Sequence, residues 1–266
     1  MLPEVYSRYR EVHSQHWWFL QRRRILEFVL DRELGKSDLA TRIGVDFGCG
    51  PGGETALLSK YCETVVGFER SSDALRGLSD SRPEISWLCA DLNHAAQTIK
   101  PASLDVALLC NVIYHSWIED DADQFRMMSR LLKAGGLLIV TEAAFDSLRR
   151  ARDEADRGAR RYRLPQICQM GELDEFEQVE ASYFNMLPFP FAWLLARMQP
   201  SRRNLSGGAF DDLALPARWL NELILALLGI ERLALRRGIP IPFGMNILTV
   251  WRKRGESAGL GGDVKQ

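Results

Sequence analysis

Short apolar runs alternate with amphipathic stretches through the first two thirds of the chain, and each run has the length of a β-strand. The runs occupy residues 43–47, 64–68, 85–90, 104–110 and 137–141. Helical spacing of apolar residues falls between them, at 55–62, 72–78 and 118–133, after a leading helix at 17–34. This alternation predicts an α/β fold with a doubly wound, mostly parallel sheet, to which residues 178–185 and 246–251 add a sixth and a seventh strand.

About 60 residues separate the last two predicted strands, far more than an ordinary loop contains. This length predicts a helical insertion or lid, with helices at 191–198 and 216–237. The second helix is apolar on more than one face, so the core, a homodimer partner or a peripheral membrane contact must cover it. The predicted parts are a helical cap at 1–40, the core at 41–186, the insertion at 187–244, the final strand at 245–254 and a disordered tail at 255–266.

Acidic residues and glycines follow the first three runs. The first run passes Asp46 and turns at three glycines, Gly48, Gly50 and Gly52, where bare backbone can approach a ligand. The second ends at Glu69, 21 residues after Gly48, where a doubly wound fold places a carboxylate against ribose hydroxyls. The pattern therefore predicts a nucleoside site.

The third run ends at Asp91, whose carboxylate can accept a hydrogen bond from an adenine amino group while Leu92 packs on the ring. Gly48, Gly50 and Gly53 also satisfy the spacing Gly-x-Gly-x-x-Gly, so an NAD(P)-dependent oxidoreductase stays an alternative. Asp46 disfavours that alternative because its charge would lie close to a pyrophosphate, whereas it suits a cationic sulfonium.

These segments, with Asn111-Val112-x-x-His115 and Leu132-Lys133-x-Gly135-Gly136, resemble the class I S-adenosylmethionine-dependent methyltransferases over residues 40–145. The resemblance implies a Rossmann-like methyltransferase fold with S-adenosylmethionine as cofactor. It implies that the methionine part lies near Asp46 and Gly48, the ribose on Glu69 and the adenine near Asp91 and Leu92. The expected cofactor set also includes Arg70 and Asn111. Two alternatives on the same fold are an enzyme that does not transfer the methyl group and a non-catalytic partner subunit.

Methyl transfer mainly requires alignment of a nucleophile behind the methyl group. The reacting atoms are expected beyond the carboxyl ends of the strands, near residues 111–117 and 142–145. There His115 is the candidate general base, because its ordinary pKa is near neutrality; organising the loop is its alternative role. An aromatic wall for the acceptor is predicted from Tyr114, Trp117, Tyr162 and Phe184. No metal is expected, since only Asn111 and Glu142 stand where metal-dependent members carry ligands.

Composition narrows the class of partner. The net charge of −1 gives no drive toward nucleic acid, which favours a small-molecule substrate. The expected reaction methylates an oxygen or nitrogen of a secondary metabolite, a glycan or a lipid intermediate. The five cysteines have no Cys-x-x-Cys spacing and are expected to be reduced, as in a cytoplasmic protein. No signal peptide and no apolar run of membrane-spanning length is predicted.

Overall fold

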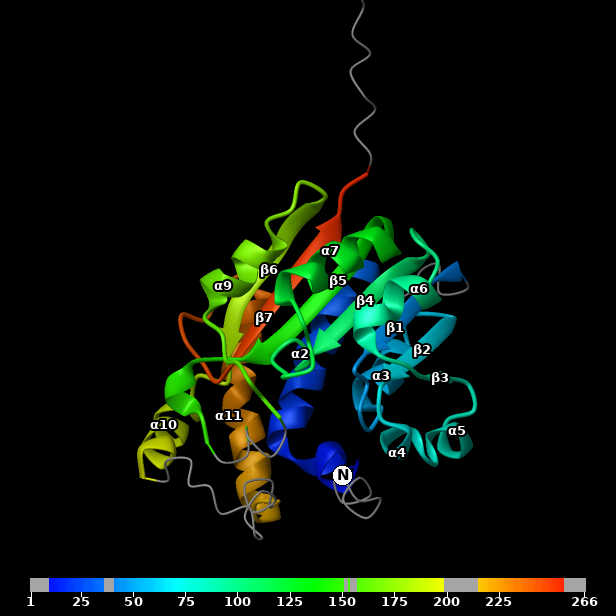
Figure 1. The fold of residues 1–266 in the computed structure, drawn as a ribbon. Helices are drawn as coiled ribbons and strands as arrows, with labels where there is room; N and C mark the ends of the chain where they lie inside the picture. The colour runs from blue at the N-terminus through cyan, green and yellow to red at the C-terminus, as the bar shows by residue number, and fades with distance from the viewer. Residues whose placement is uncertain (1–9, 36–40, 151–152, 154–156, 199–214, 256–266) are drawn as a thin grey trace, which may run out of the picture.

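Seven strands form one sheet in the computed structural model, which describes residues 10–35, 41–150, 153, 157–198 and 215–255. The order across the sheet is β3-β2-β1-β4-β5-β7-β6 (Figure 1). The strands are β1 (Ile43–Phe47), β2 (Thr64–Glu69), β3 (Ser86–Cys89), β4 (Leu104–Cys110), β5 (Leu132–Ala143), β6 (Phe176–Phe184) and β7 (Asn246–Lys253). β1 to β5 pair in parallel, and β7 pairs antiparallel with both β5 and β6. The predicted α/β fold is therefore confirmed.

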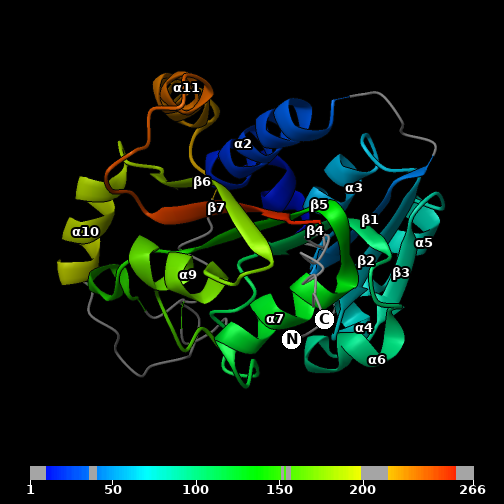
Figure 2. The same cartoon turned by 90° about the horizontal axis from the view of Figure 1, so that it is seen from above.

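Helices cover both faces of this sheet. Figure 2 shows α2, α3 and α11 over one face and α7 and α9 over the other, with α10 beyond the edge formed by β6. The α-helices are α2 (Trp17–Leu34), α3 (Gly53–Leu58), α4 (Ser72–Leu75), α5 (Leu78–Ser81), α6 (Ala95–Thr98), α7 (Asp121–Leu131), α9 (Leu164–Gly171), α10 (Phe189–Met198) and α11 (Arg218–Arg236). Short 3-10 turns are η2 (Leu92–His94) and η3 (Asp146–Leu148).

The core lies where the central strands are covered on both faces. In β4 and β5 the side chains of Val106, Leu109, Leu137 and Val140 are completely buried. Strands buried on both faces read as continuous apolar runs, which is why these two were visible in the sequence. Burial of this kind contributes about 1.5 to 3 kcal/mol for each large aliphatic side chain.

The structure corrects several predicted boundaries. The helix expected at 118–133 ends at Leu131, and β5 begins at Leu132 instead of residue 137. Gly135 and Gly136 therefore lie inside an irregular strand, with a register shift opposite Leu104 and Val106, and do not terminate the helix. The helix expected at 72–78 divides at Gly77, whose φ of +75° interrupts it.

Other differences concern segments without strong periodicity. α6 and α9 were not predicted, because a single helical turn and an eight-residue helix give too short a pattern. The sequence also predicts a charged helix at 147–161. The structure has η3 at the start of this range, and residues 151–152 and 154–156 lie outside the described residues. The same holds for 256–266, which contain most of the predicted disordered tail.

The predicted insertion between β6 and β7 contains the two expected helices, α10 and α11. α11 packs along α2, and the side chain of Asn221 accepts a hydrogen bond from the Trp17 N–H at 2.8 Å. In the part of the chain that the structure describes, no helix is both long and apolar enough to cross a bilayer.

Candidate functional site

The turn after β1 brings bare backbone to the end of the sheet. Gly48 has φ +70°, and a Cβ atom there would lie 2.6 Å from Cγ2 of Val112. Gly52 has φ +78°, and a Cβ atom there would lie 2.7 Å from the ring of Trp87. Positive φ and contacts this close exclude larger residues, so glycine at both positions keeps the loop tight.

Glu69, at the end of β2, holds this loop in place. Its carboxylate accepts hydrogen bonds from the N–H groups of Gly50 at 3.2 Å and Ser71 at 2.9 Å. Burial raises the pKa of Glu69, and these backbone hydrogen bonds oppose the rise. Each carboxylate oxygen still has acceptor capacity for a ligand hydroxyl.

A pocket lies at the carboxyl ends of β1 to β4. It is lined by Gly48, Phe68, Glu69, Arg70, Ala90, Leu92, Asn111, Val112, His115 and Trp117. Seven of the residues predicted from the sequence for the cofactor and the chemistry are in this set: Gly48, Glu69, Arg70, Leu92, Asn111, His115 and Trp117. The position follows the rule for open α/β sheets, in which ligands bind beyond the strands' carboxyl ends.

Three other residues predicted for the cofactor do not line the pocket but lie in the loops next to it. The Gly50 N–H is engaged by Glu69, and Gly52 is the N-cap of α3. Asp91 caps η2 by accepting hydrogen bonds from the backbone N–H and side-chain amide of Asn93, both at 3.0 Å. One oxygen of the carboxylate that is expected to bind adenine thus already accepts hydrogen bonds within its own turn.

Asp46 lies beneath the loop and is 1% exposed. One carboxylate oxygen accepts a hydrogen bond from the Thr55 hydroxyl at 2.6 Å, and the other has no hydrogen-bond partner among the described residues. Burial, with the nearby charge of Glu54, raises the pKa of Asp46 to about 7. A cationic ligand group at this position would stabilise the ionised form.

A buried ion cluster joins α2 to α3 behind the pocket. The guanidinium of Arg22 donates to Glu54 through Nε at 3.1 Å and Nη2 at 3.0 Å, and through Nη1 to the Asn111 side chain at 3.3 Å. His13 lies 3.3 Å from the other Glu54 oxygen. Burial would raise the pKa of Glu54, but Arg22 and His13 outweigh it and hold that pKa well below its usual range.

Sequence reasoning missed this cluster. Arg22 stands in a run of three arginines, and only its helical phase with Phe19 and Ile25, both buried, distinguishes it from its neighbours. That phase places Arg22 on the buried face of α2, whereas Arg24 is exposed.

The loop after β4 carries the candidate acceptor residues. It starts at Asn111, with φ +60°, and its Val112 and Ile113 N–H groups donate to one oxygen of Glu142 at 2.8 and 2.9 Å. The His115 ring is half-buried and stacks on Trp117 with 3.7 Å between ring centroids. Glu142, at the end of β5, therefore fixes the loop that presents His115 to the pocket.

Three members of the predicted aromatic wall lie in the core instead. Phe184 is completely buried, and Tyr162 is buried with its hydroxyl within hydrogen-bond distance of Asp121 and the Ile113 carbonyl. Tyr114 is buried with its ring against Gly158. Of the four, Trp117 alone lines the pocket, because the packing of distant segments decides which side chains turn inward and the sequence does not show it.

Two arginines close to this loop bind groups of the protein itself. Arg160 donates to the carbonyls of His115 and Ile118 and pairs with Asp121 at 3.2 Å. Arg161 pairs with Asp153 at 2.8 Å. They stabilise the loop after β4 and its neighbours. Among the described residues, no group of three or more histidine, cysteine, aspartate or glutamate side chains is placed to hold a metal ion.

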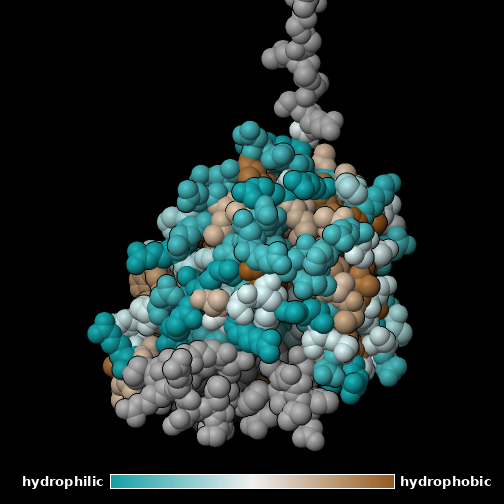
Figure 3. Space-filling view, in the orientation of Figure 1, coloured by the Kyte–Doolittle hydropathy of each residue, from teal (hydrophilic) through white to brown (hydrophobic). Residues whose placement is uncertain are grey.

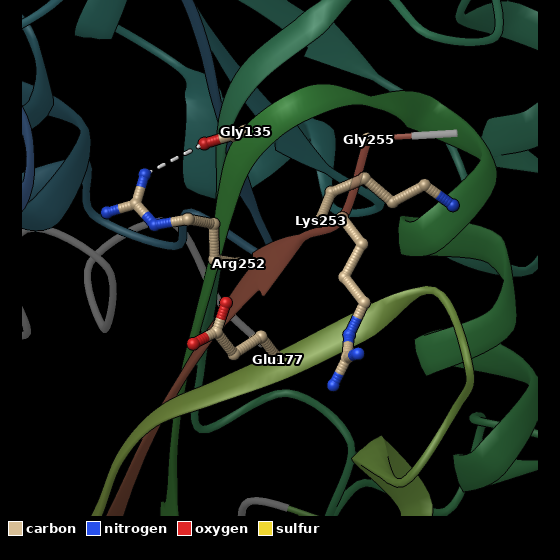
Figure 4. Close-up of a pocket in the computed structure, with 6 residues that line it drawn as sticks. Gly135, Glu177, Arg252, Lys253 and Gly255 are labelled. Atoms are coloured by element: carbon tan, nitrogen blue, oxygen red, sulfur yellow. Dashed lines mark hydrogen bonds between the residues drawn. The ribbon is translucent and has the colours of Figure 1, made fainter. Parts of the chain in front are cut away.

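A second hollow lies at the opposite end of the sheet (Figure 4). Its lining is Gly135, Glu177, Arg252, Lys253, Arg254 and Gly255. The Arg252 guanidinium donates to the Gly135 carbonyl at 3.0 Å. This hollow faces the amino ends of the parallel strands and contains none of the predicted site residues, so it is not the candidate active site.

The burial of Glu142 predicts that the stability of the protein depends on pH. Burial raises its pKa to about 8. Between the ordinary carboxyl pKa and pH 8 the unfolded chain therefore releases a proton that the folded chain retains, so the wild type loses stability as pH rises. Glu142→Gln keeps an acceptor oxygen and does not titrate.

We expect Glu142→Gln to gain stability relative to wild type between pH 5 and pH 8, by about 1 kcal/mol or more. Urea unfolding at both pH values measures this difference. A difference that does not change with pH would contradict the raised pKa. Glu177→Gln, an exposed carboxylate on β6, is the matched control.

Comparison with known proteins agrees with the fold and the pocket. Residues 45–140 match the family model described as a methyltransferase domain. The chain carries a class I S-adenosylmethionine-dependent methyltransferase domain, and S-adenosylmethionine is the cofactor of that domain.

Among curated proteins, the chain is similar to a trans-aconitate 2-methyltransferase of Azoarcus sp. (strain BH72), with 32% identity over 124 residues. The match covers 43% of this chain and 47% of that relative, so it spans less than half of the relative's length.

Two solved structures share the fold. One is the complex of the Trm112 methyltransferase activator and a methyltransferase from Haloferax volcanii, with TM-score 0.58, 14% identity and coverage of 94% of this chain and 95% of that one. The other is phosphoethanolamine N-methyltransferase 2 of Haemonchus contortus in complex with S-adenosyl-L-methionine, with TM-score 0.51, 17% identity and coverage of 87% and 52%.

Proposed function

We propose that this protein transfers the methyl group of S-adenosylmethionine to an oxygen or nitrogen atom of a small molecule. The observation that carries the proposal is that one pocket combines Gly48, Glu69 and Leu92, suited to a nucleoside, with His115 and Trp117 of the loop after β4. The cofactor residues and the candidate base thus face the same space. The similarity to a trans-aconitate 2-methyltransferase supports a small-molecule acceptor.

The residues of the site fit the cofactor chemically. Glu69 has acceptor capacity for ribose hydroxyls, and Leu92 is an apolar surface for the adenine ring. The unpartnered oxygen of Asp46 suits the positive charge of the methionine part. Gly48 lines the same pocket with its backbone, next to Val112.

When bound, the cofactor supplies a methyl group on a positively charged sulfur. The chain's own contribution is then positioning: Glu142 fixes the loop after β4, and that loop places the His115 ring beside the cofactor pocket. The bound cofactor would supply this methyl group to an oxygen or nitrogen atom of the acceptor. His115 takes the proton that the acceptor loses, so the charge balances.

Calorimetric titration with S-adenosylmethionine and S-adenosylhomocysteine, with NADH and NADPH as controls, tests the cofactor half of the proposal. We expect dissociation constants on the order of micromolar for the first pair and no heat from the second. An acceptor screen with a labelled methyl group then tests transfer. Turnover that leaves the cofactor intact would indicate a non-methylating enzyme, and binding of neither pair would favour a non-catalytic subunit.

Replacement of Glu69 by alanine is expected to weaken S-adenosylmethionine binding by about 1 to 3 kcal/mol, because ribose hydroxyls lose a buried charged acceptor. Titration calorimetry gives the change in Kd. Glu63→Ala, which removes an exposed carboxylate just before the same strand, is the matched control and should leave Kd unchanged. Equal affinities of Glu69→Ala and wild type would remove Glu69 from the cofactor site.

A further inference from the structure

α11 is apolar on two opposite faces. Leu225, Leu228 and Leu235 are buried toward the protein. On the other side Trp219 and Ile230 are each 66% exposed, and Leu223 and Leu227 lie between them, at spacings of four, four and three residues. Such spacing places the four side chains along one stripe of the helix. We call this stripe, Trp219, Leu223, Leu227 and Ile230, the outer face of α11.

α10 has exposed apolar side chains of its own. Phe191 is 66% exposed and Met198 70%, with Leu194 between them at helical spacing. Figures 1 and 2 place α10 past the β6 edge and α11 over the face that also carries α2. Figure 3 shows a front face that is mostly hydrophilic, with apolar residues scattered over it. An exposed apolar surface spread over two helices is unusual for a protein that acts alone in solution.

Positive charge accompanies this surface. Residues 187–244 contain seven arginines and four acidic residues, a net charge of +3 in a chain whose total is −1. Arg218 starts α11 and Arg237 follows its last residue. Arg197 lies over the Trp193 ring at 4.4 Å. Glu222 is the exposed acidic residue of α11, and it already pairs with Arg218 at 2.9 Å.

This charge pattern disfavours a second copy of the chain as the partner. Because arginines stand at both ends of α11, both parallel and antiparallel pairing of two outer faces would bring arginines close to arginines. Like charges brought together oppose association, whereas an anionic surface attracts all of them. Arginines beside exposed tryptophan and leucine are typical of helices that lie in the interface of an anionic bilayer.

We propose that the outer face of α11 docks onto an anionic lipid bilayer, with the helix lying in the plane of the interface. Trp219, Leu223, Leu227 and Ile230 enter the headgroup region, and Arg218 and Arg237 contact lipid phosphates. The contact is peripheral, since no described helix can cross a bilayer. This proposal does not rest on methyl transfer.

Co-sedimentation of the full chain with vesicles tests the proposal. We expect vesicles of phosphatidylcholine with about one third phosphatidylglycerol to bind the protein at least about tenfold more tightly than phosphatidylcholine alone. Leu223→Gln/Ile230→Gln should weaken that binding by about tenfold or more, because buried apolar area drives insertion. Arg218→Gln/Arg237→Gln should weaken it by roughly fivefold per charge and reduce its salt dependence.

The matched control is Lys60→Gln/Arg126→Gln, which removes two exposed basic charges elsewhere and should bind vesicles like the wild type. Titration with S-adenosylmethionine and circular dichroism establish that each variant is folded, and the arginine variant leaves the apolar stripe intact. Absence of binding to anionic vesicles would overturn the proposal. A control that loses as much binding as Arg218→Gln/Arg237→Gln would also overturn it. So would light scattering that finds a stable dimer which Leu223→Gln/Ile230→Gln converts to a monomer.

Discussion

Replacement of Arg22 by leucine is expected to lower the free energy of unfolding by about 3 to 5 kcal/mol. Arg22 is 4% exposed and makes two hydrogen bonds to Glu54, which is 3% exposed. Without the guanidinium, the Glu54 carboxylate stays buried with His13 as its neighbour and loses its main compensating charge. Urea unfolding of the protein without cofactor measures the loss.

Arg24→Leu is the matched control, because Arg24 lies two residues away on the exposed side of the same helix. We expect a change within about 0.5 kcal/mol for this surface position. The double variant Arg22→Leu/Glu54→Leu removes both charges and should recover much of the stability lost by Arg22→Leu. A single variant as stable as wild type would show that the cluster is not needed for folding.

The Arg22–Glu54 pair also predicts that the free energy of unfolding depends on pH in the acid range. The folded chain keeps Glu54 ionised below its ordinary pKa of 4.5, where the unfolded chain takes up a proton. The stabilisation is therefore present above about pH 4.5 and is lost as pH falls toward the lowered pKa of the folded state. The stability difference between wild type and Arg22→Leu should shrink below this pH in the same unfolding experiment.

Replacement of His115 by alanine is expected to lower turnover at saturating cofactor by about a hundredfold or more if His115 removes the acceptor's proton. The side chain lines the cofactor pocket and stacks on Trp117, which fixes the plane of its ring. The labelled-methyl assay measures the turnover of both proteins.

His115→Phe separates the two roles of this residue. Phenylalanine can keep the stacking on Trp117 but cannot accept a proton. Both variants therefore lose the base, whereas only His115→Ala also loses the ring that could hold the loop in position. Near-normal turnover of His115→Phe would favour the positioning role. Ser116→Ala, an exposed neighbour in the same loop, is the control and should retain activity.

The sequence predicted the sheet well, and several of the residues that it predicts for the cofactor line one pocket. β1 to β4 are short apolar runs in register with their neighbours, and the residues at their carboxyl ends meet at one edge for geometric reasons. Gly48 and Glu69 could therefore be placed together from their spacing, and Asn111 was added by the family resemblance; all three line one pocket. Glycines with positive φ leave a signal in the sequence because few other residues can replace them.

The inward or outward direction of loop and strand side chains could not be predicted in this way. Phe184 and Tyr162 are aromatic and stand near the site in the sequence pattern, yet packing buries both. Glu142 was seen only as an isolated acid, since its hydrogen bonds reach Val112 and Ile113 thirty residues earlier in the chain.

What the sequence by itself determined is the order of the elements and the chemistry at the strand ends, because periodicity and glycine placement are local properties of the chain. Only the tertiary structure decided which charges are paired and which apolar faces are covered. Arg22 meets Glu54 across 32 residues, and one apolar face of α11 packs against the protein while the other stays exposed. Both outcomes depend on how distant segments pack, and local patterns carry no information about that.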